Sequence, residues 1–243
     1  MRRVLVAGDS LSMARYVDGL LYEQIYPVRV QLACPHDIVI NGSMRGNCSR
    51  AIASEPYLSE FLLPLRPHHV VLQVGIVDCT PRLFSSREKL ILAAMQRIPG
   101  LRSASRAVIS TASRHRYALT RRRPLCEVSP ADFGRYLRAF AGAARESNPE
   151  CALTIVNVPH PGEAHVRANY RVASNIEQYN AILQELATEL HAGLVDLHAY
   201  TARNPSSLLP DGYHLSAAAH EFIHQELVWR LHTRNGNQHL PQP

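Results

Sequence analysis

Short apolar runs alternate with longer amphipathic segments along most of this chain. The apolar runs predict buried strands at Val4–Ala7, at Val28–Leu32 or the nearby Ile38–Ile40, and at Val70–Val74, Leu153–Val158 and Leu194–Leu197. The amphipathic segments predict helices at 13–25, 49–63, 86–97, 130–147, 175–191 and 216–232. Strands that alternate with helices favour a parallel sheet covered on both faces. We therefore expect an α/β fold, a three-layer αβα sandwich around a parallel five-stranded sheet.

One connection in this pattern is too long for a single crossover. About 75 residues separate Gly75 from the fourth strand near Cys151, where one crossover unit needs about 30–40 residues. A long insertion at the functional edge of a sheet is often a lid or specificity element, although it can equally be a helical layer that only packs. We expect one domain over 1–232 with an insertion at about 79–130, followed by a flexible tail over 233–243.

Length and composition fit a protein with one large core. The chain has 243 residues, of which 46% are hydrophobic. No apolar run approaches the roughly 20 residues that span a bilayer. The apolar stretch after Arg2-Arg3 is too short for a secretory signal, so we expect a cytoplasmic protein. The five cysteines are odd in number and form no Cys-x-x-Cys pair, which favours reduced thiols over disulfides or a zinc site.

The net charge of +6 comes almost wholly from arginine, since Lys89 is the only lysine. The densest cluster is Arg114-His115-Arg116 followed by Arg121, Arg122 and Arg123. This cluster can be a solvated helix face or a contact for an anionic substrate. It lacks the interleaved aromatic residues and the motifs of nucleic-acid binding, so no nucleic-acid partner is expected.

The candidate chemistry begins at Gly8-Asp9-Ser10, directly after the first predicted strand. A serine there lies at the carboxyl end of the sheet, where open α/β folds bind ligands, but it needs a base to become a nucleophile. Asp211 and His214 lie three residues apart near the C-terminal helix. At this spacing the carboxylate can accept the imidazole Nδ1–H and leave Nε2 free to take the serine proton. His160 and His165 follow the fourth strand and are the main competitors for this role.

Four spaced blocks resemble the SGNH (GDSL-type) hydrolase family, and they occur in the family's order. The blocks are Gly8-Asp9-Ser10-Leu11-Ser12, the segment 39–49 containing Gly46-Asn47, the segment 71–78 ending in Gly75-Ile76-Val77-Asp78, and Asp211-Gly212-Tyr213-His214. The resemblance implies a flavodoxin-like fold in which Ser10 is the nucleophile. It also implies that the backbone N–H groups of Ser10 and Gly46 hold the oxyanion, and that no metal or organic cofactor is needed.

The third block departs from the family, which has an asparagine where this chain has Val77. Loss of one oxyanion donor can cost about 10²–10³ in rate. Another donor can replace it, with Asn47, Thr80 and Arg82 nearest in sequence; alternatively, two backbone donors suffice or the protein is a weak catalyst. Gly75 and Asp78 are expected to shape the turn after the third strand.

The expected function is that of a serine esterase or acylhydrolase acting on a small-molecule ester, such as a short acyl group on a sugar or secondary metabolite. An acyltransferase with the same triad and a ligand-binding member of the fold are the alternatives. A nucleotide-binding glycine motif, a Gly-x-Ser-x-Gly motif and a metal-ligand cluster are all absent from the sequence. The candidate substrate contacts are Arg121, Arg122 and Arg123.

Overall fold

The computed structural model describes residues 1–233 and contains one parallel sheet with the strand order β2-β1-β3-β4-β5. The strands are β1 (Arg3–Gly8), β2 (Ile38–Asn41), β3 (His69–Gln73), β4 (Ala152–Val156) and β5 (Gly193–Val195). This is the strand order of flavodoxin-like folds. The predicted α/β fold with a parallel five-stranded sheet is therefore confirmed. The predicted tail over 233–243 lies outside the described residues, apart from Thr233.

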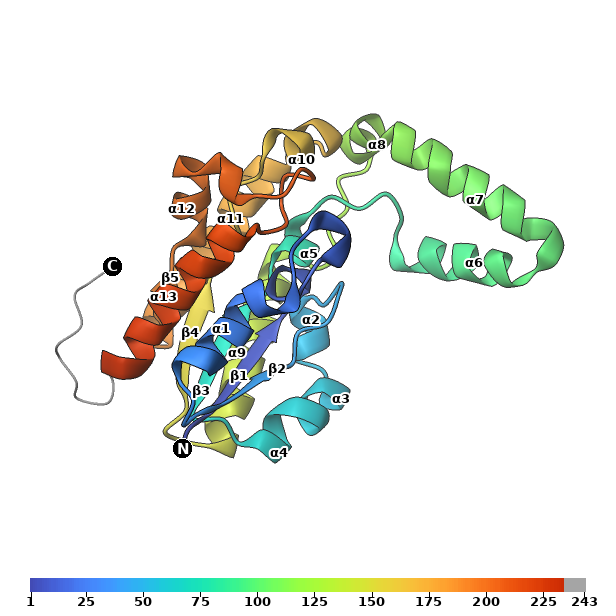
Figure 1. The fold of residues 1–243 in the computed structure, drawn as a ribbon. Coiled ribbons are helices and arrows are strands. Elements are labelled where there is room, and N and C mark those ends of the chain that lie inside the picture. Colours follow the sequence, from blue (N-terminus) through green and yellow to red (C-terminus); the bar gives the residue numbers. More distant parts are fainter. Residues whose placement is uncertain (234–243) are drawn as a thin grey trace.

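Helices cover both faces of the sheet. They are α1 (Tyr26–Ala33), α2 (Ser49–Ile52), α3 (Glu55–Tyr57), α4 (Leu63–Leu65), α5 (Ile76–Cys79), α6 (Ser86–Arg97), α7 (Pro99–Arg114), α8 (Arg116–Arg122), α9 (Pro130–Ser147), α10 (Glu163–Ala168), α11 (Val172–Glu189), α12 (Leu197–Arg203) and α13 (Ala217–Thr233). In Figure 1, α1 and α13 lie side by side in front of the sheet and α9 lies behind it. The core between these layers is built around large buried side chains, among them Tyr26, Phe133, Phe140 and Tyr179.

Two sequence-based assignments differ from the structure near the N-terminus. The predicted helix over 13–25 is wrong, because the chain there forms two 3₁₀ turns, Tyr16–Asp18 and Tyr22–Gln24. Gly19 adopts a left-handed conformation with φ +77° and reverses the chain between them. Of the two alternatives for the second strand, Ile38–Ile40 is right, whereas 28–32 lies within α1.

Proline shapes the next helical segment. The single helix predicted over 49–63 is divided into α2, α3, a π-helical turn at Leu58–Leu62 and α4. Pro56 and Pro64 lie in the first turns of α3 and α4. A proline has no backbone N–H, so Pro56 is suited to the first turn of a helix, where it begins α3. Pro64 instead follows the π-helical turn, within a helical run that continues over 55–65.

The long insertion contains three helices with different surroundings. Helices α6 and α7 pack against each other and project away from the sheet, as Figure 1 shows. Helix α8 returns toward the main body and contacts α10. An isolated antiparallel β-bridge between the backbones of Arg82 and Leu125 joins the two ends of the insertion at its base. The insertion therefore has an outer part, α6 and α7, and a base that lies at the carboxyl edge of the sheet.

The turn after β1 holds Ser10 at this edge. The Asp9 carboxylate accepts the backbone N–H of Leu11 at 2.8 Å and caps the 3₁₀ turn Ser10–Ser12. Ser12 Oγ lies 2.6 Å from Gln73 Oε1, and its hydroxyl also pairs with Tyr26. The turn is thus tied to β3 and to α1. Burial of Asp9, which is fully enclosed, raises its pKa to about 8.

This raised pKa predicts how stability depends on pH. The native protein keeps a proton on Asp9 that the unfolded chain loses near its ordinary pKa of 3.8. The free energy of unfolding should therefore fall as pH rises from about 4 to about 8, with this group adding at most about 1.4 kcal/mol per pH unit. Asp9→Asn keeps an oxygen for the Leu11 N–H but cannot titrate, so it should lack this slope.

Measuring the free energy of unfolding of the wild type and Asp9→Asn with denaturant above pH 6.5 isolates the pH dependence that Asp9 causes. The buried residues His165 and His220, whose pKa values are lowered from 6.5 to about 4 and about 3, contribute slope only below that pH. Parallel stability profiles for the two proteins would show that Asp9 is already ionised in the native state.

A glycine fixes the turn after β3. Gly75 has φ +133°, a conformation that other residues rarely adopt, and a Cβ there would lie 2.6 Å from Val158 Cγ2. This tight approach lets α5 begin directly at the sheet edge. We expect Gly75→Ala to lower the free energy of unfolding by about 1–3 kcal/mol through strain and overpacking.

Gly142→Ala is the matched control for this substitution. Gly142 lies within α9 with open space around the position of a Cβ. Alanine should therefore stabilise that helix, by about 0.5–1 kcal/mol. Denaturant titration measures both changes, and a Gly75→Ala protein as stable as Gly142→Ala would contradict the assigned strain.

Candidate active site

Two residues from opposite ends of the chain meet at the carboxyl edge of the sheet. Ser10 follows β1, and His214 lies in the loop before α13. The Ser10 Oγ lies 2.9 Å from His214 Nε2. The His214 side chain is buried, while Ser10 is half-buried. The structure thus brings together the serine and the histidine that the sequence analysis selected.

Asp211 completes this hydrogen-bonded series. Its Oδ2 lies 2.6 Å from His214 Nδ1, and its Oδ1 accepts the backbone N–H groups of Tyr213 and His214. Burial by itself would raise the pKa of Asp211, but these hydrogen bonds outweigh it and hold the pKa well below its usual range. The carboxylate is ionised at neutral pH. It can therefore fix the imidazole tautomer with Nδ1 protonated and Nε2 facing Ser10.

Arg15 is a neighbour of this series that the sequence analysis missed. Its Nη1 lies 3.0 Å from His214 Nε2, and its Nη2 lies 3.7 Å from Asp211 Oδ2. An ion pair with Asp18 at 2.7 Å holds the other side of the guanidinium. Arg15 lies in the segment that the pattern wrongly assigned to a helix. The 3₁₀ turns bring the Arg15 side chain next to His214, and the sequence pattern gave no sign of this contact.

Gly46 lines the same pocket as Ser10 and has φ +79°. It lies in the loop between β2 and α2. Asp78 anchors this loop, because its Oδ1 accepts both the backbone N–H of Ser49 at 2.9 Å and the Ser49 hydroxyl at 2.6 Å. Burial raises the pKa of Asp78 to about 6 despite these hydrogen bonds. The second and third sequence blocks are thus joined by one buried carboxyl group.

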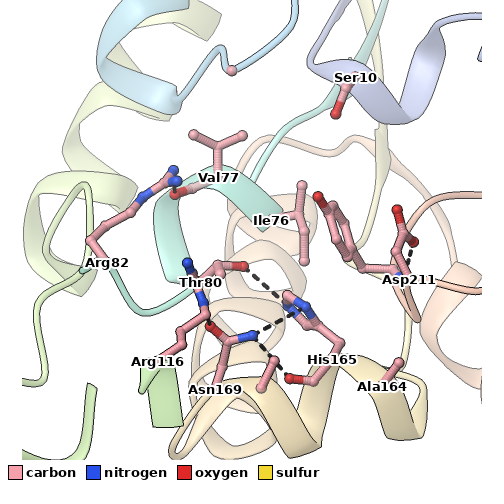
Figure 2. Close-up of a pocket in the computed structure, with 13 residues that line it drawn as sticks. Ser10, Ile76, Val77, Thr80, Arg82, Arg116, Ala164, His165, Asn169 and Asp211 are labelled. Carbon is pink, nitrogen blue, oxygen red and sulfur yellow. Dashed lines mark hydrogen bonds between the residues drawn. The ribbon is translucent and has the colours of Figure 1, made fainter. Parts of the chain in front are cut away.

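Val77, which the sequence analysis aligned with the family's side-chain donor, lines the same pocket as Ser10 (Figure 2). The three candidate substitutes have different surroundings. Asn47 is buried and its Nδ2 donates to the Gly8 carbonyl at 3.2 Å. Thr80 and Arg82 line the pocket. The Thr80 hydroxyl lies 3.3 Å from His165 Nε2, and Arg82 Nη2 donates to the Val77 carbonyl at 2.5 Å.

The pocket itself has a volume of about 430 Å³ and is lined by both polar and apolar side chains. Ser10 lies at one side in Figure 2, and Arg116, Asn169 and His165 lie at the other. Arg116 and Arg82 come from the base of the insertion, so this base forms part of the pocket wall. Burial, followed by the charge of Arg116, lowers the pKa of His165 to about 4, which leaves its imidazole neutral at pH 7.

The three arginines selected as substrate contacts lie elsewhere. Arg121, Arg122 and Arg123 are exposed, Arg123 pairs with Glu88, and Arg122 lines a separate groove between α7 and α8. The arginine of this segment that reaches the pocket is Arg116. The density of charge in the sequence identified a segment that contributes one side chain to the pocket, but it could not show which of the arginines that side chain belongs to.

The competing histidines occupy distinct positions. His165 lines the pocket but is hydrogen-bonded to Thr80, whereas His160 packs edge-on against His198.

Residues 1–233 bring together no group of three or more His, Cys, Asp or Glu side chains that could hold a metal ion. Every helix in that part of the chain is too short or too polar to cross a membrane.

Solved structures share this fold. The lipase/acylhydrolase from Enterococcus faecalis superposes with a TM-score of 0.65 at 16% identity, over 96% of this chain and 97% of that one. The acetylxylan esterase Axe2 from Geobacillus stearothermophilus gives 0.60 at 15% identity over 95% and 94%. TesA gives 0.59 at 19% identity over 94% and 97%. A comparison with curated proteins found no match.

The sequence itself carries the family relationship, since a family model matches most of its length. The match covers residues 6–222, from the middle of β1 into α13, and so includes Ser10, Gly46, Asp211 and His214. The chain belongs to the GDSL-like Lipase/Acylhydrolase family.

Proposed function

We propose that this protein is a serine esterase that cleaves a carboxylic ester through an acyl-enzyme at Ser10. The observation that carries the proposal is the series from Ser10 Oγ to His214 Nε2 at 2.9 Å and from His214 Nδ1 to Asp211 Oδ2 at 2.6 Å. This series opens onto the pocket that Ser10 and Gly46 line. Membership of an acylhydrolase family supports ester cleavage.

In the proposed reaction, Ser10 Oγ attacks the ester carbonyl carbon while His214 Nε2 takes its proton. Asp211 stays ionised and stabilises the imidazolium that forms. The carbonyl oxygen becomes an oxyanion that the backbone N–H groups of Ser10 and Gly46 can bind. When the tetrahedral intermediate collapses, His214 returns the proton to the leaving alcohol. Water then attacks the acyl-enzyme by the same steps and releases the acid.

Pocket size supports a small substrate. A volume of about 430 Å³ lies at the lower end of the range for small-molecule sites. It has room for a short acyl group or a compact alcohol. The fold shared with an acetylxylan esterase agrees with a short acyl group on a sugar or a secondary metabolite.

Arg82 is the best-placed substitute for the missing amide donor. Its bond to the Val77 carbonyl holds the guanidinium beside the residue that occupies the family's asparagine position. The Asn47 amide instead donates a hydrogen bond to the Gly8 carbonyl, and the Thr80 hydroxyl is hydrogen-bonded to His165. A fixed cation beside a developing oxyanion stabilises it without reorganisation during the reaction. We therefore assign this electrostatic role to Arg82.

Ser10→Ala should lower kcat for p-nitrophenyl acetate by at least about 10⁴-fold, because the nucleophile is removed. A fluorophosphonate probe should label the wild type and leave Ser10→Ala unlabelled. Ser43→Ala is the control, since Ser43 is buried close to Gly8 and its hydroxyl has no hydrogen-bond partner among the described residues. It should keep both activity and labelling.

Full activity in folded Ser10→Ala would refute the triad. Product analysis with added sugar alcohols separates hydrolysis from transfer. Free acid as the main product supports the esterase, whereas an acylated acceptor as the main product favours an acyltransferase that uses the same residues.

Arg82→Gln should lower kcat for a neutral ester by about 10-fold or more with little change in KM, as expected for a group that acts mainly on the transition state. Val77→Asn alone should leave kcat unchanged or lower it, because the introduced amide competes for space beside Arg82. In the Arg82→Gln background the same substitution should restore activity. Thr80→Val is the control and should change kcat little.

A large gain in Val77→Asn alone, together with an Arg82→Gln variant of normal activity, would contradict this assignment. It would show instead that the enzyme works with the two backbone donors only.

A further inference from the structure

The pocket that Ser10 lines carries more positive than negative charge. Two guanidinium groups, those of Arg82 and Arg116, line it. The nearest acid to Arg82 is Glu127 at 3.4 Å, but this carboxylate is shared with Arg50 and Lys89. Within residues 1–233, Arg116 forms no ion pair with any carboxylate. Asp211 also lines the pocket, but its carboxylate is hydrogen-bonded to His214. The Arg116 charge is therefore not compensated by an ion pair.

Neutral partners hold Arg116 in place. Its Nε donates to Asn169 Oδ1 at 2.6 Å, and its Nη2 donates to the Pro81 carbonyl at 2.8 Å. These two bonds fix the guanidinium plane and engage neither N–H of Nη1. A guanidinium fixed in this way can bind a carboxylate or phosphate oxygen with little further loss of side-chain freedom.

The other groups at this side of the pocket are uncharged. His165 is neutral at pH 7, and its ring is held between Thr80 and Asn169. Burial and the like charge of Arg82 both act against the Arg116 cation and lower its pKa. The negative charge of an anionic ligand would stabilise the Arg116 cation against both effects, whereas a neutral ligand would not.

From this geometry we propose that the pocket takes esters that carry a carboxylate or phosphate group, which Arg116 binds while Ser10 meets the ester carbonyl. The inference rests on the proposed esterase function and adds the charge class of the substrate. The anionic group can belong to the acyl half or to the alcohol half of the ester. A purely structural role for Arg116, as a link between α8 and α10, is the alternative that the experiment must separate.

Two matched pairs of esters test the proposal in the full-length protein. The first pair differs in the acyl half: the p-nitrophenyl monoester of glutaric acid against p-nitrophenyl valerate. The second pair differs in the alcohol half: the acetyl ester of p-hydroxybenzoate against that of p-hydroxybenzamide. We expect kcat/KM to favour the anionic member of at least one pair by about 10-fold, which corresponds to about 1.4 kcal/mol. The pair that responds identifies the half that carries the charge.

Substitutions then assign the preference to one side chain. Arg116→Gln should abolish the preference, and Arg116→Lys should restore part of it. Arg121→Gln removes the same charge from an exposed position on the same helix, α8, and should leave the preference unchanged. An Arg116→Gln variant that loses activity equally on anionic and neutral esters would show a structural role and overturn the proposal. Equal kcat/KM values within both pairs in the wild type would overturn it as well.

A measurement on the wild type alone covers the case in which Arg116→Gln does not fold. Glutarate should inhibit the hydrolysis of p-nitrophenyl valerate competitively, while uncharged glutaramide should not. Equal inhibition by the two compounds would contradict an anion subsite.

The experiment also distinguishes failure of the proposed esterase function from failure of the anion subsite. If none of the four esters is cleaved, the proposed function fails, and calorimetry tests the subsite by itself with glutarate and inorganic phosphate. Binding to the wild type that is lost in Arg116→Gln and kept in Arg121→Gln would support the anion subsite. An absence of measurable binding to the wild type would refute it.

Discussion

The site depends on the parallel pairing of β1 with both β2 and β3. Parallel pairing directs the carboxyl ends of all three strands to one edge, so the loops after them must meet there. Short buried hydrogen bonds then fix these loops to one another. Ser12 is tied to Gln73 at the end of β3, and Ser49 to Asp78 in α5. The approach of His214 to Ser10, across 204 positions of sequence, follows from this arrangement once α13 packs against α1.

The carboxyl groups at this edge have pKa values shifted in opposite directions, and the direction of the shift determines the role that each can have. Asp9 and Asp78 are enclosed, and burial raises their pKa values to about 8 and about 6. Both act on the backbone, as a cap and as a loop anchor. Asp211 is only partly buried and accepts three hydrogen bonds, which keep it ionised. A permanently charged carboxylate is what a histidine base needs beside it, because the charge stabilises the imidazolium.

The insertion links the fold to the choice of substrate. Its outer helices α6 and α7 project away from the sheet, while its base delivers Arg82 and Arg116 to the pocket. The two parts of the insertion therefore differ in their relation to the pocket, because only the base contributes to its wall. If Arg82 assists the oxyanion and Arg116 binds an anionic group, one insertion both compensates for Val77 and sets the charge class of the substrate.

The sequence by itself predicted an α/β fold with a parallel five-stranded sheet and selected Ser10, Asp211 and His214, but it left the second strand open between 28–32 and 38–40. Hydrophobic periodicity is a local property, and Asp211 and His214 need only a short turn to meet. The sequence did not reveal the path of 13–25, because its amphipathic pattern predicted a helix where the chain forms two 3₁₀ turns, and the position of Arg15 was missed with it. Only the tertiary structure separated Arg116 from Arg121, Arg122 and Arg123, since all four are equal in charge. The direction of an arginine side chain depends on what packs around its helix, here Asn169 and the Pro81 carbonyl from segments distant in sequence.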